Sequence, residues 1–249
     1  MILVKSPREI EVMRRAGAVV GRFFEEARSL VRPGLRTGDL EEFAERFIAR
    51  NGVRSAFKGY MGYPAHLCAS INEEVVHGIP SMDRTLREGD ILSVDFGIQR
   101  EGYYGDSAMT FPVGEVDDLS RRLLDATQRS LAAGIGEVSP GNRLGDISAA
   151  VQEVVEAEGF SVVRDFVGHG IGKSMHEDPQ VPNFGKRGAG PKLQPGMVLA
   201  IEPMVNAGGC SVEVLADGWT VVTRDRSRSA HFEHTVAVTE DGFRILSLP

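Results

Sequence analysis

The chain has 249 residues, of which 42% are hydrophobic and 25% are charged, a composition typical of a globular enzyme with a substantial core. The formal net charge of -7 leaves no basic surplus for binding phosphates, which argues against a nucleic-acid-binding protein. No apolar run approaches the roughly 20 residues that a bilayer-spanning helix needs. The two cysteines, Cys68 and Cys210, form neither a disulfide framework nor a Cys-x-x-Cys site, so we expect a cytoplasmic protein in a reducing compartment.

The first predicted element is a helix that begins at Pro7. Ser6 and Glu9 have the spacing of a capping box, and Pro7 takes the first helical position, where proline is favoured. One face of this helix then carries Ile10, Met13, Gly17 and Val20. The corresponding helix of the second half is expected to start at Asp118.

The sequence repeats itself after 107 positions. Residues 33–39 match residues 140–146, and both segments lead into apolar residues spaced as on one face of an amphipathic helix. Gly52 and Gly159 then stop the two helices. We therefore predict one catalytic α/β (α+β) domain over residues 1–249, with two halves at roughly 7–113 and 118–240 related by a pseudo-twofold axis.

The same offset aligns two carboxylates. Residues 86–95 and residues 193–202 each consist of a turn and a β-rich run that ends in an acidic side chain, so Asp95 corresponds to Glu202. A carboxylate that follows such an apolar strand is costly to bury unless it is paired or bound to a metal ion. The repeat therefore marks Asp95 and Glu202 as candidate metal ligands.

A predicted hairpin brings a second acidic residue to Asp95. Residues 99–102 are expected to form a four-residue turn, which would place Asp95 directly opposite Asp106. Like charges in directly opposed positions destabilise a sheet, and a divalent cation would offset their repulsion. For this hairpin alone, the alternative is a solvated rim that binds no ion.

Two residues compete to be the fourth carboxylate. The strict offset from Asp106 points to Glu213, but a turn soon follows it. Glu233 precedes a β run like the one that follows Asp106. We therefore prefer Glu233 and expect an inserted hairpin around residues 217–219.

His169 is the candidate for a fifth ligand, one that breaks the symmetry of the two halves. Glycines on both sides of it would let the backbone approach a crowded centre, although by itself it is equally a histidine in a glycine-rich loop. Residues 168–174 also look like a phosphate-binding loop, but Val167 stands where that motif requires glycine. Nucleotide binding is therefore the second class of function, behind a metal site.

Taken together, these segments resemble type I methionine aminopeptidases of the bacterial type, which belong to the pita-bread metallopeptidases. The resemblance covers nearly the whole chain and is carried by residues 71–80, 93–97, 105–106, 168–172, 175–179, 200–204 and 232–235. It implies a pita-bread fold, with an antiparallel sheet covered by helices. It also implies five metal ligands: Asp95, Asp106, His169, Glu202 and Glu233.

The resemblance further implies roles for residues around the metal ions. His77 and His176 would be catalytic histidines that contact the substrate, and Glu202 would take a proton from the attacking water. The methionine side chain would lie against Tyr60, Tyr63, Cys68, Trp219 and Phe57. Phe57 departs from the bacterial pattern, which often has cysteine there, and this leaves the pocket shape open.

The implied activity is that of a metal-dependent exopeptidase that removes the N-terminal methionine from nascent proteins and peptides and prefers a small second residue. In this scheme a water shared by two divalent ions attacks the first peptide bond. Four carboxylates and one histidine are compatible with cobalt, manganese, iron or zinc. The alternative is an Xaa-Pro peptidase of the same fold, like prolidase or aminopeptidase P. We expect a monomer that contacts the ribosome transiently and binds neither nucleic acid nor membrane.

Overall fold

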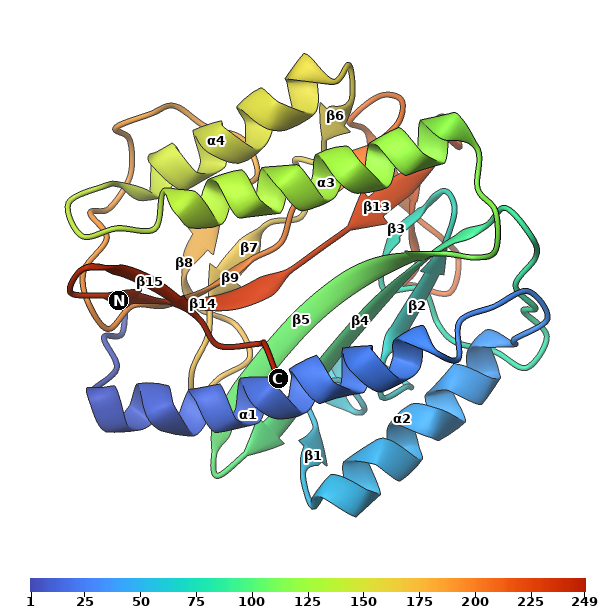
Figure 1. The fold of residues 1–249 in the computed structure, drawn as a ribbon, viewed down its shortest axis with the longest axis horizontal. Helices are drawn as coiled ribbons and strands as arrows, with labels where there is room; N and C mark the ends of the chain where they lie inside the picture. The colour runs from blue at the N-terminus through green and yellow to red at the C-terminus, as the bar shows by residue number, and fades with distance from the viewer.

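Two pairs of helices flank the strands of this protein, whose computed structural model describes residues 1–249. Figure 1 shows α1 (Pro7–Arg28) and α2 (Thr37–Asn51) on one side, α3 (Asp118–Gly136) and α4 (Leu144–Ala157) on the other, and strands β5 and β14 between them. Every pair of strands is antiparallel. The predicted mixed fold is therefore confirmed. None of the helices combines the length and apolar character needed to cross a bilayer.

The helix starts follow from local capping. The Ser6 side chain accepts a hydrogen bond from the Glu9 backbone, and the Glu9 carboxylate accepts one from Ser6 in return, so the predicted start of α1 at Pro7 is confirmed. Helix α3 begins at Asp118, as expected, and its cap is the Asp117 side chain. Two of the four initial N–H groups of a helix are thus satisfied in α1 by this one reciprocal contact.

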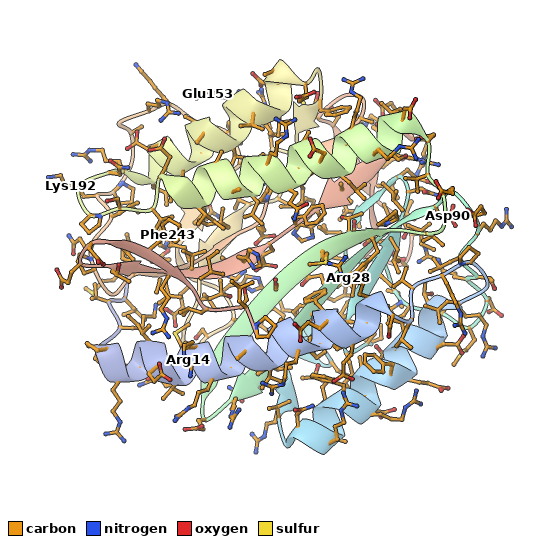
Figure 2. All side chains as sticks on the ribbon, in the orientation of Figure 1. Arg14, Arg28, Asp90, Glu153, Lys192 and Phe243 are labelled. Atoms are coloured by element: carbon orange, nitrogen blue, oxygen red, sulfur yellow. The ribbon has the colours of Figure 1, made fainter.

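Local structure recurs between the two halves. Arg36 precedes α2 and donates its backbone N–H to Asp39, and Arg143 does the same before α4 with Asp146. The same two arginines form isolated bridges at matching positions, Arg36 with Thr85 and Arg143 with Lys192. In Figure 2, Asp90 of the first half and Lys192 of the second lie at opposite edges of the molecule.

The strands form four small sheets. In the first half, β4 (Ile91–Arg100) pairs with β1 (Arg54–Ser55), β2 (Cys68–Ile71) and β5 (Tyr103–Pro112). The largest sheet of the second half runs in the order β15 (Gly242–Ile245), β14 (His234–Thr239), β9 (Val198–Ile201), β7 (Gly168–Gly170) and β8 (Glu177–Val181). A third has the order β13 (Ser229–His231), β10 (Met204–Asn206) and β6 (Ser161–Val162). The fourth has the order β11 (Val212–Val214), β12 (Val221–Thr223) and β3 (Glu74–Val76).

The predicted register of the β4–β5 hairpin is wrong by two residues. Asp106 lies opposite Gly97, and Asp95 lies opposite Ala108. The turn contains only residues 101–102, both with positive φ, and this conformation matches the twist of a tight hairpin. Because side chains alternate with a period of two, a shift of two leaves both aspartates on the same face, as diagonal rather than direct neighbours.

The core of the first half lies between its two helices and strands β2, β4 and β5. Phe23 of α1 stacks on Phe96 of β4, with ring centroids 3.8 Å apart, and both rings are fully buried. Such a stacked pair adds to the stabilisation that comes from burying two large apolar surfaces. This contact determines which face of β4 packs against the core.

Replacing Phe23 by alanine should lower the free energy of unfolding by about 3–5 kcal/mol, since it removes a buried aromatic ring and leaves a cavity. Chemical denaturation measures the change. Phe243→Ala is the matched control, because that ring is 44% exposed, and it should shift stability by less than ~0.5 kcal/mol. Equal effects of the two substitutions would contradict the position assigned to this core.

Candidate metal centre

The predicted ligands point away from the core because strand residues alternate between two faces. Val94 and Phe96 are fully buried in the core of the first half, so Asp95 between them faces the opposite way. In the second half, Ile201 and Phe232 belong to the core, and the carboxylates that follow each of them, Glu202 and Glu233, face the same cavity as Asp95.

Three of the predicted ligands lie close enough together to hold one ion. Ligand atoms of Asp106, His169 and Glu233 are all within 4.8 Å of one another, and all three side chains are buried. The Glu202 carboxylate adjoins them, with Oε1 3.5 Å from His169 Nε2. Asp95 completes the group beside Asp106. The structure thus brings together all five residues expected from the sequence.

Burial and mutual repulsion disfavour the ionised forms of these carboxyl groups. Burial raises the pKa of Asp106 to about 7. The pKa of Asp95 lies well above its usual range, first because of burial and then because of the charges of Asp106 and Glu202. Burial followed by the charge of Asp106 raises the pKa of Glu202 and that of Glu233 in the same direction. Without a cation, four ionised carboxylates are unfavourable here.

The donor set of this cavity fits a divalent cation. Buried oxygens of Asp95, Asp106 and Glu233 have no hydrogen-bond partner in the protein, which is uncommon for buried polar atoms. No lysine or arginine lines the cavity to neutralise them. Carboxylate oxygens and an imidazole nitrogen are suitable ligands for first-row divalent metals, so these five residues could hold such ions.

The ligand segments of the two halves are joined by reciprocal hydrogen bonds. The Ser107 hydroxyl donates to the Glu233 carbonyl at 2.6 Å, and the Thr235 hydroxyl donates to the Asp106 carbonyl at 2.8 Å. The Glu233 N–H donates to the Ala108 carbonyl at 2.9 Å. Each half therefore holds in place the backbone of a ligand residue that belongs to the other half.

His169 is held by its glycine neighbours and by its own Nδ1. A Cβ at Gly168 would lie 2.3 Å from the Ala200 carbonyl oxygen, and one at Gly170 would lie 2.1 Å from that of Asp178. Only glycine permits this approach. The Nδ1–H of His169 donates to the Gly170 carbonyl at 2.9 Å, which leaves Nε2 as the free ligand atom facing Glu202.

The five ligands lie at the base of a cavity of about 210 Å³ that also contains every predicted substrate-binding residue. Its lining residues are Phe57, Tyr60, Met61, Tyr63, Cys68, Val76, His77, Asp95, Asp106, Phe166, Val167, His169, Met175, His176, Glu202, Met204, Trp219 and Glu233. Most of them are apolar, so the cavity combines a carboxylate-rich base with a wall suited to an apolar side chain.

The apolar wall is rigidly built. The Tyr63 hydroxyl donates to the Leu67 and Gly78 carbonyls, each at 3.1 Å, and its ring meets Trp219 edge-on at 5.1 Å. Cys68 is buried, and burial raises the pKa of its thiol well above the usual value, so it stays neutral. Phe57 is buried in the same wall.

The two predicted catalytic histidines come from different halves and are held differently. His77 adopts a positive φ of 61° and lies edge-on to Phe166 and Trp219. Burial lowers its pKa to about 4, with a smaller contribution from His176. His176 is more exposed, although burial still lowers its pKa, and its Nδ1 is 2.7 Å from the Tyr60 hydroxyl. Both imidazoles are therefore neutral near pH 7.

Some residues in the cavity or beside its carboxylates were not anticipated from the sequence. His231 is almost fully buried, its Nε2 lies 3.5 Å from Glu202 Oε2, and that nitrogen has no hydrogen-bond partner. His231 ends β13, two residues before Glu233 in the sequence. Phe166, Met175 and Met204 also line the wall, and nothing in the sequence pattern distinguishes them from ordinary core residues.

The two alternatives left open by the sequence find no support in the structure. Glu213 is on β11, part of the expected hairpin, where it forms an ion pair with Arg226 at 2.7 Å and is 40% exposed. Residues 168–174 run from β7 towards β8 without an intervening helix. A phosphate-binding loop needs the N-terminus of a helix to face the phosphate, so this segment lacks the required geometry.

Two halves built of antiparallel strands enclose a buried carboxylate cluster suited to metal ions, and residues 11–240 match metallopeptidase family M24. The chain is 53% identical to methionine aminopeptidase 1 of Bacillus subtilis over 99% of each chain. It is 45% identical to the Escherichia coli methionine aminopeptidase over 99% of this chain and 94% of the relative. The crystal structure of Thermotoga maritima methionine aminopeptidase matches this structure over 100% of each chain, with a TM-score of 0.98 and 48% sequence identity.

The fold is shared more widely. Prolidase from Pyrococcus furiosus has a TM-score of 0.79 at 21% identity, covering 99% of this chain and 65% of the prolidase. The chain belongs to metallopeptidase family M24, and its pita-bread fold is confirmed.

The metal-free protein should become less stable as the pH rises from 6.5 to about 8. Because burial raises the pKa of Asp106 to about 7, the folded state keeps a proton that the unfolded state releases near the ordinary aspartate pKa of 3.8. Stability is thus lost as the pH rises through the folded-state pKa. The buried histidines, whose pKa is lowered, act in the opposite sense up to about pH 7.5, but the raised pKa of Asp95, Glu202 and Glu233 extends the loss of stability above that pH.

Thermal unfolding of chelator-treated protein measures this dependence, and the Tm should be lower at the higher pH. Protein loaded with manganese is the control, since a cation offsets the repulsion and should flatten the response. A Tm that stays constant or rises without metal would contradict the assigned carboxylate environment.

Glu233→Ala should abolish metal loading at one site at least, because it removes a buried carboxylate at the centre of the ligand group. Metal content after dialysis, measured by elemental analysis, tests this. Glu213→Ala is the matched control, because its carboxylate is engaged at the surface with Arg226, and metal content should remain that of the wild type. The reverse pattern would contradict the assignment of the fourth carboxylate.

Proposed function

We propose that the chain is a methionine aminopeptidase that removes the N-terminal methionine from peptides and nascent proteins. The observation that carries this proposal is one cavity in which a carboxylate-rich base meets an apolar wall containing Phe57, Tyr63 and Trp219. The names of the relatives that match it over nearly their whole length support the same activity. We propose that residues 1–249 act as one catalytic domain.

We propose that the carboxylates and His169 hold two divalent ions. Asp95, Asp106, His169, Glu202 and Glu233 would hold these ions, and Asp106 and Glu233 are the most deeply buried of the carboxylates. When bound, such ions supply Lewis acidity, which lowers the pKa of water and polarises a carbonyl group. Cobalt, manganese, iron and zinc all suit this donor set.

The substrate would enter with its free amino terminus towards the carboxylates and its first side chain against the apolar wall. An unbranched methionine side chain fits a narrow apolar cavity, and burying it contributes about 1.5–3 kcal/mol. Asp95, Asp106 and Glu233 line the cavity where the free amino group would lie, so the cut would fall after the first residue. This geometry accounts for an exopeptidase.

The remaining roles fall to side chains that touch the scissile bond. His176 would donate a hydrogen bond to the scissile carbonyl oxygen, where negative charge develops. His77 would contact the scissile amide and assist its departure as an amine. Glu202, at the edge of the carboxylate group and 3.5 Å from His169 Nε2, would accept the proton of the attacking water.

An Xaa-Pro peptidase is less well supported. The Pyrococcus furiosus prolidase shares the fold at 21% identity, and this chain spans only 65% of it. The identity to methionine aminopeptidases is more than twice as high over their full length. We further propose that the enzyme works as a cytoplasmic monomer and contacts the ribosome transiently while it acts on nascent chains.

The peptide Met-Ala-Ser should be cleaved to release methionine, and an Xaa-Pro peptide should not. Activity should disappear after chelation and return when manganese, cobalt, iron or zinc is added back, because the carboxylate cluster needs a cation to serve as a catalytic centre. Chromatographic detection of free methionine measures the reaction. Cleavage of the Xaa-Pro peptide in preference to Met-Ala-Ser would overturn the proposal.

A further inference from the structure

A hydrogen bond crosses the mouth of the cavity between the two halves. It joins the Tyr60 hydroxyl, in the short helix η1 (Tyr60–Gly62), to Nδ1 of His176, which directly precedes β8, with the two atoms 2.7 Å apart. The two rings are tilted against each other, with centroids 5.3 Å apart. Neither the hydroxyl nor the imidazole has another side-chain hydrogen bond, and the imidazole also packs edge-on against the His169 ring, with centroids 4.3 Å apart.

The backbone beneath Tyr60 is closed into a tight loop. The Tyr60 N–H donates to the Phe57 carbonyl at 2.8 Å, the Tyr63 N–H donates to the Tyr60 carbonyl at 2.9 Å, and the Gly59 N–H donates to the Tyr63 carbonyl at 2.8 Å. Gly59 and Gly62 have φ values of 88° and 90°, which glycine adopts without strain. Tyr60 therefore projects from a fixed support.

The backbone beside His176 is also anchored. Glu177 accepts hydrogen bonds from Lys5 Nζ at 2.7 Å and from the Ser174 N–H at 3.2 Å, and the Lys5–Glu177 pair is 6% exposed on each side. This anchor does not fix the His176 imidazole itself. The rotation and the tautomer of the ring depend on the groups that contact it.

We propose that Tyr60 is a positioning residue that fixes the tautomer of His176 and thereby makes it a hydrogen-bond donor to the substrate. The Tyr60 hydroxyl donates to Nδ1, so the single proton of the neutral ring is held on Nε2. This inference rests on the proposed function for the identity of the acceptor, the scissile carbonyl oxygen.

The alternative tautomer would work against the reaction. With the proton on Nδ1, Nε2 would present a lone pair to a carbonyl oxygen that becomes more negative in the transition state, and the contact would be repulsive. With the proton on Nε2, the same geometry gives a donor that strengthens as the charge develops. A phenol favours the useful tautomer because it is a stronger hydrogen-bond donor than acceptor, and the Tyr60 hydroxyl has no other side-chain acceptor than Nδ1.

Nitrogen NMR of zinc-loaded protein labelled with [¹⁵N]histidine tests the tautomer directly, at about pH 8, where histidines are neutral. The chain contains six histidines, and His176→Ala identifies the signals of His176 by their loss. In the wild type, Nε2 should carry the proton and Nδ1 should not. In Tyr60→Phe, the His176 signals should move towards the average of two exchanging tautomers.

Tyr63→Phe is the matched control for the spectra. It removes a second tyrosine hydroxyl from the same cavity, but that hydroxyl bonds to the Leu67 and Gly78 carbonyls and not to a histidine. The tautomer of His176 should stay as in the wild type. A proton on Nδ1 in the wild type, or an unchanged tautomer in Tyr60→Phe, would overturn the proposal.

The kinetic consequence separates positioning from a role as pocket wall. Tyr60→Phe keeps the ring, so KM for Met-Ala-Ser should change little while kcat falls about three- to tenfold, the effect of one hydrogen bond. A raised KM with unchanged kcat would overturn the positioning role. A wild type that does not cleave the peptide would contradict the proposed function, and the spectra would still decide the tautomer.

Discussion

Four carboxylates, Asp95, Asp106, Glu202 and Glu233, face one another in a cavity that no lysine or arginine lines, and this repulsion is the constraint on which the rest of the structure depends. Ionising them together in low dielectric is unfavourable, so the chain must hold them by other means. The packed helices and strands of both halves supply that support, and a cation removes the repulsion. Fold stability and metal affinity are therefore linked: the framework that tolerates the charges also prearranges them as ligands.

The support comes from the junction of the halves rather than from either half alone. The Ser107 and Thr235 hydroxyls each bond to the backbone of a carboxylate segment in the opposite half. Buried hydroxyls can do this because they both donate and accept, whereas an apolar pair would leave backbone groups unpaired. The site thus belongs to neither half, and displacing one half would move Asp106 and Glu233 apart.

Much of the site followed from two periodicities in the sequence. The 107-residue repeat paired Asp95 with Glu202, and the strand period of two kept Asp95 and Asp106 on one face even though the predicted hairpin register was wrong by two residues. Contacts between distant segments were not predictable in this way. The approach of His231 to Glu202 and the hydrogen bond from Tyr60 depend on how loops from both halves meet, and neither leaves a local signal in the sequence.

The two histidines illustrate why such loop contacts matter. His77 is fixed by packing: its positive φ, Phe166 and Trp219 leave its ring little freedom, and burial lowers its pKa to about 4. His176 lies at the more open side of the cavity, where its packing against the His169 ring does not determine which nitrogen carries the proton. A side chain in that position needs a directional partner, and a hydrogen bond from the opposite half provides one. Because the cavity is open where a peptide would enter, His176 needs a hydrogen-bonding group such as the Tyr60 hydroxyl to orient its ring.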